Sequence, residues 1–316
     1  MKITLVTPAD KGSRSGNRTT ADRWAQILRK LRHRVEVVVD YDGAPARLMV
    51  AIHAWRSAAQ IRRFKETYPD RPLVLCLSGT DIYRFQRSHP QETLRSMELA
   101  DAIVCLHDLV GRAIPAEFAR KLNVIRQSAL PLKRVPPVKR SFEICVVGHL
   151  RDEKDPLRAA MAVRDVRESS KLKVIQLGKA HDEAWAASAE AQTASNPRYE
   201  WRGEVPYGQV RKMYARARAM VISSRMEGGA NVISEAVVAG LPVIASAIDG
   251  NVGLLGIDYP GYFPLEDTVA LRDLLLRAET EPEFLATLKR HGDRLAPGFA
   301  PARELAAWRD LIAKLK

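Results

Sequence analysis

Short apolar runs alternate with amphipathic segments along almost the whole chain. In the first half the apolar runs are KITLVT, RVEVVVD, LMVAIHA, PLVLCLS, DAIVCLH and KLNVIR, and stretches such as ADRWAQILRKLR and AAQIRRFKETY lie between them. Strands that alternate with helices need crossover connections, and these produce a parallel sheet covered on both faces. The pattern therefore predicts a doubly wound first domain.

A proline-rich basic segment, ALPLKRVPPVKRS, interrupts this alternation. A second series of apolar runs follows it: FEICVVGHL, LKVIQLG, RYEWRGEV, AMVISS, PVIAS and GYFPL. The chain then ends in a helical segment, ARELAAWRDLIAKLK. We predict the α/β class with two Rossmann-like domains, residues 1–136 and 137–297, joined by a linker.

Composition narrows the class of protein. The 316 residues are 46% hydrophobic, enough to bury sizeable cores. No apolar run approaches the roughly 18 residues that span a bilayer, and the N-terminus lacks the apolar region of a signal peptide. The three cysteines, Cys76, Cys105 and Cys145, lie in strand-like runs without metal or redox spacing, so we expect buried thiols in a soluble cytoplasmic protein.

The formal net charge of +13 indicates anionic partners. Nucleic acid, a membrane surface and small phosphorylated substrates all satisfy this condition. The basic residues are spread over loops and helices with few interleaved aromatics, which disfavours nucleic acid. We therefore expect small anionic substrates, without nucleic-acid binding or stable membrane insertion.

Ligands of parallel sheets bind beyond the carboxyl ends of the strands. One such loop is SSRMEGGANVISEA, residues 223–236, between the strand AMVI and a helix. A helix beginning near Gly228 would place backbone amides there, suited to phosphate, with Glu235 about two turns into the helix. Glu227 and Glu235 could then bind hydroxyls of an extended ligand, or could simply be a solvated and a capping glutamate.

The longer segment, residues 198–251, resembles the retaining glycosyltransferases of the large family that contains sucrose and bacterial mannosyl transferases. That family has the GT-B architecture, two Rossmann-like domains facing across a cleft. Its E-x(7)-E pair is matched by Glu227 and Glu235, and Gly203 and the Gly-Leu-Pro-Val after the helix also agree. The resemblance implies that a nucleotide-sugar donor binds the second domain, an acceptor the first, and that residues 298–316 pack back on the first domain.

The loop VVGHLRDEKDP resembles the family's G-R-L-x-x-x-K element, whose cations neutralise the leaving diphosphate. Lys154 matches the lysine, His149 replaces the arginine, and Arg151 could supply the missing charge. The family often has Phe-Gly where this chain has Gly229 and Ala230. The resemblance implies no metal and a set of UDP-sugar-binding residues: His149, Gly228, Gly229, Ala230, Asn231, Val232, Glu235 and Gly203.

The first loop, TPADKGSRSGNRTTADRW, is rich in glycine and strongly cationic, which is typical of an anion site before a helix. A second strand end carries LSGTDIY, and His53 follows another strand. The candidate acceptor-anion residues are Lys11, Gly12, Arg14, Gly16, Asn17, Arg18, Gly79, Thr80 and Asp81. The candidate catalytic residues are Glu227, Lys154, Arg151 and His53.

The chain as a whole resembles the selenosugar synthases of selenoneine biosynthesis. The resemblance implies transfer of the sugar of UDP-N-acetylglucosamine or UDP-glucose to selenophosphate, which forms a carbon–selenium bond and releases UDP and phosphate without a cofactor. A conventional O-glycosyltransferase with a hydroxyl acceptor in cell-envelope glycan synthesis is the alternative, and an epimerase or phosphorylase on the same fold stays open. The preferred sugar, the anomeric outcome and the oligomeric state stay open too.

Overall fold

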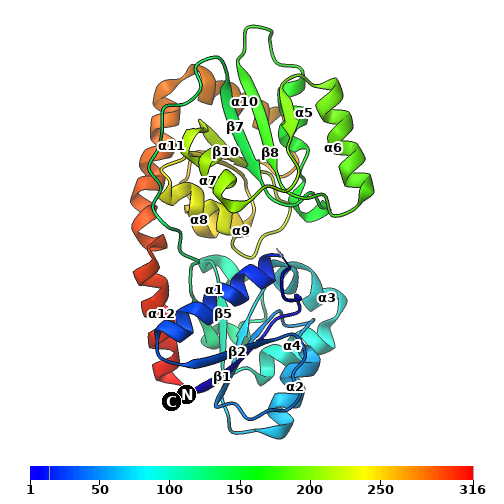
Figure 1. The fold of residues 1–316 in the computed structure, drawn as a ribbon, viewed down its shortest axis with the longest axis vertical. Helices are drawn as coiled ribbons and strands as arrows, with labels where there is room; N and C mark the ends of the chain where they lie inside the picture. The colour runs from blue at the N-terminus through cyan, green and yellow to red at the C-terminus, as the bar shows by residue number, and fades with distance from the viewer. Residues whose placement is uncertain (14, 316) are drawn as a thin grey trace. The chain divides into compact units, whose positions relative to one another are not determined.

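The computed structural model describes residues 1–13 and 15–315, and the chain divides into two compact units (Figure 1). Unit 1 comprises Met1–Gln127 with Pro301–Lys316, and unit 2 comprises Ser128–Ala300. The division falls ahead of residue 136 because the proline-rich segment lies on unit 2, where Arg134 donates hydrogen bonds to the carbonyls of Tyr214 and Ala217.

Unit 1 contains a parallel sheet in the order β2-β1-β3-β4-β5-β6. Its strands are β1 (Lys2–Val6), β2 (Arg34–Val38), β3 (Leu48–Ile52), β4 (Leu73–Cys76), β5 (Ala102–Cys105) and β6 (Leu122–Val124). Its helices are α1 (Gly16–Lys30), α2 (Ala58–Thr67), α3 (Gln86–Ser88), α4 (Pro90–Leu99), α12 (Pro301–Lys314), the π-helix η1 (Asp81–Phe85) and the 3-10 helices η2 (Asp108–Arg112) and η3 (Ala116–Lys121). Buried apolar clusters cover both faces of this sheet, as parallel sheets require.

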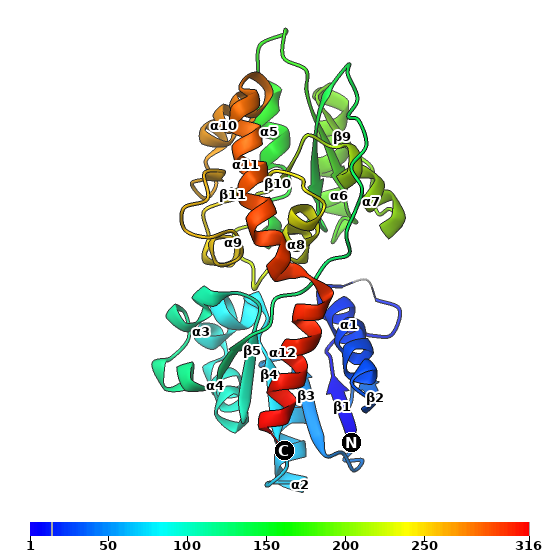
Figure 2. The ribbon, with the colours of Figure 1, turned by 90° about the vertical axis from the view of Figure 1, so that its left-hand side faces the viewer.

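Helix α12 lies against α1, although the two are separated by almost the whole chain (Figure 2). Trp308 of α12 packs edge-on against Trp24 of α1, with 5.0 Å between ring centroids. The indole of Trp24 donates a 2.9 Å hydrogen bond to the buried carboxylate of Glu304, and Arg23 lies 3.2 Å from the same group. The last helix thus completes the core of unit 1.

Unit 2 contains a second parallel sheet, in the order β12-β11-β10-β7-β8-β9. Its strands are β7 (Phe142–Val147), β8 (Leu172–Leu177), β9 (Tyr199–Trp201), β10 (Ala219–Ile222), β11 (Val243–Ser246) and β12 (Tyr262–Phe263). Its helices are α5 (Arg158–Arg164), α6 (Glu183–Ser195), α7 (Tyr207–Arg216), α8 (Asn231–Val238), α9 (Asp249–Leu255), α10 (Thr268–Thr280), α11 (Pro282–Leu295) and the 3-10 helices η4 (Asp152–Lys154) and η5 (Ala296–Phe299).

Every apolar run named from the sequence forms one of these strands, so the predicted α/β class with two doubly wound parallel sheets is confirmed. The cysteines are buried, as expected. Burial raises the pKa of Cys105 and of Cys145 to about 12, which makes these thiols inert. Within the described residues, no helix is both long and apolar enough to cross a membrane.

Candidate active site

Three loops of unit 2 lie at one edge of its sheet. Strands β11, β10 and β7 are neighbours and run parallel, so the segments that follow them emerge side by side. These segments are residues 148–156 after β7, 223–230 after β10 and 247–249 after β11. This edge carries most of the donor-site residues predicted from the sequence.

Lys154 and Glu227 meet at this edge. Lys154 ends η4, and its Nζ lies 2.5 Å from Oε1 of Glu227. The same carboxylate oxygen accepts a 2.6 Å hydrogen bond from the hydroxyl of buried Ser224. Glu227 is 8% exposed, so its charge is held by a cation and a hydroxyl close to the surface. The structure thus brings together two residues that the sequence placed in separate motifs.

Helix α9 packs against the backbone of the loop after β10 and restricts its position. A Cβ built on Gly250 would lie 2.1 Å from the carbonyl oxygen of Glu227, so only glycine permits this approach. Buried Asn251 donates to the carbonyl of Ser246 at 2.9 Å, and the hydroxyl of Ser246 donates to the carbonyl of Ser224 at 2.6 Å. These contacts determine the backbone position of Glu227, and so the point from which its side chain extends.

The loop after β7 is tied to the same segment. The hydroxyl of Ser223 donates to the carbonyl of Asp155 at 2.8 Å, and the guanidinium of Arg225 lies 2.6 Å from the carboxylate of Asp152. Asp155 itself has a left-handed backbone, with φ of +42°. Within this loop, Ser223 and Ser224 could not be singled out from the sequence as site residues, because serine after a strand is common.

The positions of His149 and Arg151 differ. His149 lines a small cavity of about 20 Å³ together with Lys154 and Glu227. The side chain of Arg151 is 48% exposed and lies 3.9 Å from Glu153. Of the two candidates for the missing arginine of the family motif, His149 is therefore the one that borders the cavity beside Lys154.

Gln176 is a residue that sequence reasoning missed. It lies on β8 in register with Val146 of β7, which is in register with Val221 of β10, and all three line the same cavity. Gln176 is fully buried, and its Oε1 accepts a 3.1 Å hydrogen bond from the hydroxyl of Tyr199. Its Nε2 has no hydrogen-bond partner among the described residues. A polar side chain in an apolar strand was the only available signal.

Helix α8 begins later than predicted. It starts at Asn231, not near Gly228, because the glycines form an irregular turn in which Gly229 has φ of +122°. Glu235 therefore lies about one turn into the helix, which corrects the expected two turns. The Nδ2 of Asn231 donates to Oε1 of Glu235 at 2.9 Å, and the hydroxyl of Tyr207 donates to the same oxygen at 3.1 Å.

The N-terminus of α8 lacks a side-chain cap, so its first backbone amides can donate to a ligand. Ala230 occupies the N-cap and provides no side-chain hydrogen bond to the first amides. The first turn presents backbone N–H groups and the positive end of the helix dipole. Val232 lies in this first turn. The remaining predicted donor residue, Gly203, lies in the loop after β9 and has a φ of +64°. The predicted donor residues thus occupy strand-end loops and one helix start of unit 2.

In unit 1 the glycine-rich loop leads into α1. Ser15 caps this helix by accepting from the amide of Arg18 at 3.3 Å, so Gly16 and Asn17 belong to the first helical turn and not to the loop. The guanidinium of Arg18 lies 3.0 Å from Asp22 one turn on, which partly neutralises that cation. Lys11 and Gly12 are exposed, and Arg14 lies outside the described residues.

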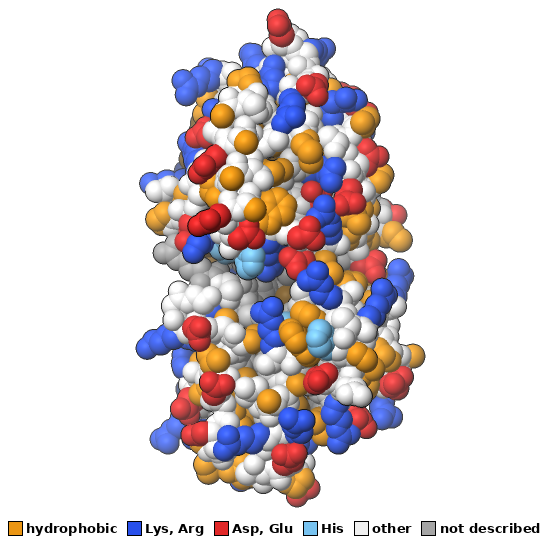
Figure 3. Space-filling view, turned by 90° about the vertical axis from the view of Figure 1, so that its right-hand side faces the viewer, with side chains coloured by type: hydrophobic (Ala, Val, Ile, Leu, Met, Phe, Trp, Pro, Cys, Tyr) orange, Lys and Arg blue, Asp and Glu red, His pale blue; other side chains and the backbone are white. Residues whose placement is uncertain are grey.

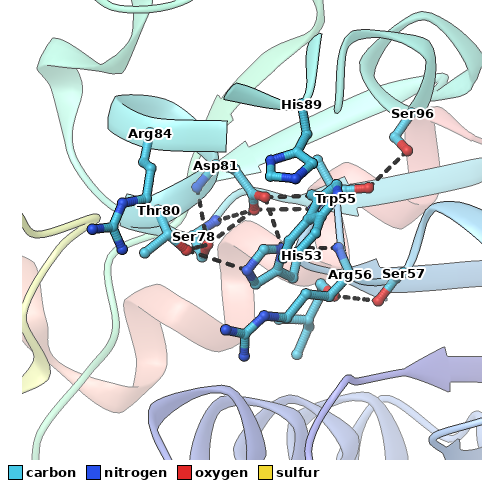
Figure 4. Close-up of polar contacts among 12 residues, drawn as sticks. His53, Trp55, Arg56, Ser57, Ser78, Thr80, Asp81, Arg84, His89 and Ser96 are labelled. Atoms are coloured by element: carbon cyan, nitrogen blue, oxygen red, sulfur yellow. Dashed lines mark hydrogen bonds and ion pairs between the residues drawn. The ribbon is translucent and has the colours of Figure 1, made fainter. Parts of the chain in front are cut away.

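His53 and Asp81 form a buried pair at the carboxyl ends of β3 and β4 (Figure 4). Nδ1 of His53 lies 2.8 Å from Oδ1 of Asp81. The Asp81 carboxylate also accepts hydrogen bonds from the amides of Ala54, Trp55 and Ser78. Burial opposes ionisation of Asp81, but the hydrogen bond and charge of His53 and the backbone amides hold its pKa below its ordinary value.

Charges are mixed over the surface. On the face shown in Figure 3, Lys and Arg side chains are interleaved with Asp and Glu over both units. Among the described residues, no group of three or more His, Cys, Asp or Glu side chains is arranged to hold a metal ion. On this face the charges do not form one large basic surface, so an anionic ligand would be recognised by individual cations such as Lys154.

Residues 132–293 match the family described as Glycosyl transferases group 1. The chain belongs to this family. Its fold is similar to those of Anabaena HepE in complex with UDP and glucose (TM-score 0.76, 14% identity, 99% of this chain and 100% of that chain) and sucrose-phosphate synthase from Thermosynechococcus elongatus (0.77, 15%, 99% and 98%). A glycosyltransferase from Rickettsia africae is also similar (0.77, 11%, 99% and 98%).

At these identities the likeness concerns the fold, and it confirms the predicted GT-B class for this group 1 glycosyltransferase. A search of curated proteins finds no match to the chain. The matched residues 132–293 include the Lys154 and Glu227 loops and helix α8. The choice of donor and acceptor has to be argued from the site.

Proposed function

We propose that this group 1 glycosyltransferase transfers the sugar of a UDP-sugar, UDP-N-acetylglucosamine or UDP-glucose, to selenophosphate. The observation that carries the donor half is the contact of Lys154 with Glu227 at the strand ends of unit 2. Anabaena HepE, which shares the fold, binds UDP-glucose, a donor of the proposed class.

Each donor residue has a role that follows from its chemistry. Departure of UDP builds negative charge on the diphosphate, and Lys154 with the amides that open α8 provides fixed positive groups for that charge. Glu227 accepts hydrogen bonds from sugar hydroxyls, and Glu235, steadied by Tyr207 and Asn231, accepts from the ribose. These positive groups supply the stabilisation that a metal would otherwise provide.

The acceptor half rests on charge in unit 1. Selenophosphate is anionic, and its soft selenium is nucleophilic without a general base, so it needs cations that hold it. The exposed, glycine-rich loop with Lys11 and Gly12 offers such a surface before the start of α1. The overall resemblance to selenosugar synthases supports this choice of acceptor.

The reaction balances as two substitutions. A selenium electron pair forms the bond to the anomeric carbon, while the bond from that carbon to the diphosphate oxygen breaks and its electron pair leaves with UDP. Water then cleaves the phosphorus–selenium bond, which gives phosphate and the selenosugar. Lys154 acts in the first step, where the leaving group gains charge.

A conventional O-glycosyltransferase is the second candidate, and the His53–Asp81 pair favours it. A buried carboxylate that orients an imidazole is the arrangement of a general base, which a hydroxyl acceptor needs and selenophosphate does not. The two candidates share the donor and differ in the acceptor.

Mass-spectrometric product analysis tests the proposal. The purified protein is incubated with each UDP-sugar, with and without selenophosphate. A selenium-containing hexose that forms only when both substrates are present, with one UDP released per product, is the expected result. If the protein binds the UDP-sugar but does not form that product, the result would favour the conventional O-glycosyltransferase. If it does not bind a UDP-sugar, both candidate functions would be rejected.

A further inference from the structure

The proline-rich basic segment between the two sheets is a sequence feature that the donor and acceptor residues do not use. Residues 128–141 form no helix or strand, and Figure 2 shows the chain running along the outside of unit 2 beside α7. Pro131, Pro136 and Pro137 lack backbone N–H groups and have a fixed φ, so the segment cannot join the edge of a sheet and has little conformational freedom to lose on binding. It therefore presents a preorganised surface.

Hydrogen bonds hold this segment lengthwise along α7. The guanidinium of Arg211 donates to the carbonyls of Leu130 at 3.3 Å and Pro131 at 2.8 Å. The amide of Val135 donates to the carbonyl of Ala215 at 3.0 Å, one helical turn further along α7. The contacts thus advance along the helix as the chain advances, and the backbone of the segment is bound toward α7.

The cations of the segment and of α7 are of two kinds. Arg134 and Arg211 donate to backbone carbonyls, and Arg216 lies 3.0 Å from Glu143, so these three hold the structure together. Four others are exposed, and within the described part of the chain none of them has an ion pair or a hydrogen bond: Lys133, Lys139, Arg140 and Lys212. Neither residues 128–142 nor α7 contains an Asp or Glu, so no carboxylate of these segments neutralises the four charges.

Large apolar side chains are exposed among these cations. Of the eight large hydrophobic residues that are exposed in the described chain, three lie here: Leu130 is 63% exposed, Val135 48% and Tyr207 52%. Tyr207 begins α7, one turn before Arg211, and its hydroxyl is bound to Glu235. Apolar surface of this kind gains free energy when a partner removes it from water.

The combination of exposed cations and exposed aliphatic side chains distinguishes between anionic partners. Single-stranded nucleic acid offers phosphates, but its sites combine cations with aromatic side chains on which the bases stack. Two of the three exposed apolar side chains here, Leu130 and Val135, are aliphatic. The headgroup region of an anionic bilayer offers negative charge at its surface and apolar chains directly beneath, so it satisfies both kinds of side chain at once.

We propose that a docking surface for an anionic lipid bilayer is formed by Leu130, Lys133, Val135, Lys139, Arg140 and Lys212. The cations bind the charged groups of the lipid heads, and Leu130 and Val135 enter the interface without a helix crossing the bilayer. This inference goes beyond the proposed function and does not depend on the identity of donor or acceptor, because none of the six residues belongs to the predicted donor, acceptor or catalytic sets.

Sedimentation of sucrose-loaded vesicles tests the surface. The vesicles contain phosphatidylcholine alone, or phosphatidylcholine and phosphatidylserine in equal parts. We expect the wild type to bind only the vesicles that contain phosphatidylserine. The double variant Lys133→Gln with Lys139→Gln should bind them about 25-fold more weakly, because each charge removed costs about fivefold. Leu130→Ser with Val135→Ser should weaken binding about tenfold, because apolar surface is lost.

The matched control is Lys30→Gln with Lys314→Gln, which changes the net charge equally at two exposed positions of unit 1 and should bind as the wild type does. The docking surface would be overturned by a wild type that binds neither kind of vesicle or both equally, or by equal binding of the two lysine double variants. Undiminished binding of the Leu130 and Val135 variant would also overturn it, because charge alone would then explain the binding. Retention of polyuridylate without vesicle binding, lost in the Lys133 and Lys139 variant, would assign the surface to nucleic acid instead.

Discussion

Nζ of Lys154 lies 2.5 Å from Oε1 of Glu227, so a cation from the loop after β7 and a carboxylate from the loop after β10 form one unit. Their side chains are 22% and 9% exposed, a position at the boundary between core and solvent. Each residue therefore has two functions in the proposed mechanism: it meets its own part of the donor, and it neutralises its partner when the donor is absent.

Lys154→Ala should lower kcat by about 10² to 10³, because it removes the positive group closest to the leaving diphosphate. It also leaves the 8% exposed Glu227 without its cation, so a small loss of stability should accompany the loss of rate. Steady-state kinetics with UDP-sugar and thermal unfolding measure the two effects. Lys171→Ala, which removes an exposed cation just before β8, serves as control. Equal losses in both variants would contradict a specific role for Lys154.

Glu235→Ala should weaken UDP binding by about tenfold, the scale of one hydrogen bond to a charged group. The carboxylate is held in place by Asn231 and Tyr207, so its removal takes away a preoriented acceptor for ribose hydroxyls. Calorimetric titration with UDP measures the change. Arg18→Ala, in unit 1, should leave UDP affinity unchanged and impair acceptor use. A loss of UDP affinity in both variants would contradict the division between donor and acceptor residues.

Strands such as LVLC at β4 and AMVI at β10 were predictable because they are continuous apolar runs. The start of α8 was not, because two glycines before Asn231 fit either a first helical turn or the irregular turn that the structure shows. Composition marks a linker between the two units, but the contacts of Arg134 are needed to show which unit the linker lies on.

Site residues divide in the same way. Glu227 and Lys154 could be proposed as site residues because spacing within a motif is visible in the chain. The sequence does not show which strands are neighbours in a sheet. For this reason the contact between Lys154 and Glu227, the pairing of His53 with Asp81 and the buried position of Gln176 could not be predicted. The pairing of Arg18 with Asp22 belongs to a third kind of information: the two are four residues apart on a helix, so their contact follows from the sequence once the helix is placed.

Asp81→Asn should destabilise the protein at pH 7 by about 1 to 3 kcal/mol, because the amide cannot accept all the hydrogen bonds of the buried carboxylate. The folded-state pKa of Asp81 is lowered, so the contribution of its charge is present above the unfolded pKa of about 4 and is lost as the pH falls through the folded pKa. The difference from wild type in urea unfolding should therefore narrow between pH 5 and pH 3. Asp70→Asn, at an exposed position, is the control. A difference that stays constant over this pH range would show that the charge of Asp81 does not contribute.

The thiols should be unreactive in the native protein. Burial raises the pKa of Cys76 well above its ordinary value and those of Cys105 and Cys145 to about 12, so almost no thiolate forms at pH 8. A thiol-specific dye should react only after guanidinium is added, and then with all three residues. One thiol that reacts rapidly without denaturant would indicate local opening of a strand.

Gly250→Ala tests how the fold positions the donor site. A Cβ at residue 250 would lie 2.1 Å from the carbonyl oxygen and 2.8 Å from the Cβ of Glu227, so either α9 or the loop after β10 has to move. Movement of the loop would separate Glu227 from Lys154, and we expect a fall in kcat of at least about tenfold, because small misplacements of reacting groups are costly. Gly292→Ala is the matched control: it lies in α11 with open space around its Cβ, and it should stabilise the protein by about 0.5 to 1 kcal/mol without changing activity. Full activity of Gly250→Ala would mean that α9 yields instead, and that the position of Glu227 is set by Ser224 and Lys154 alone.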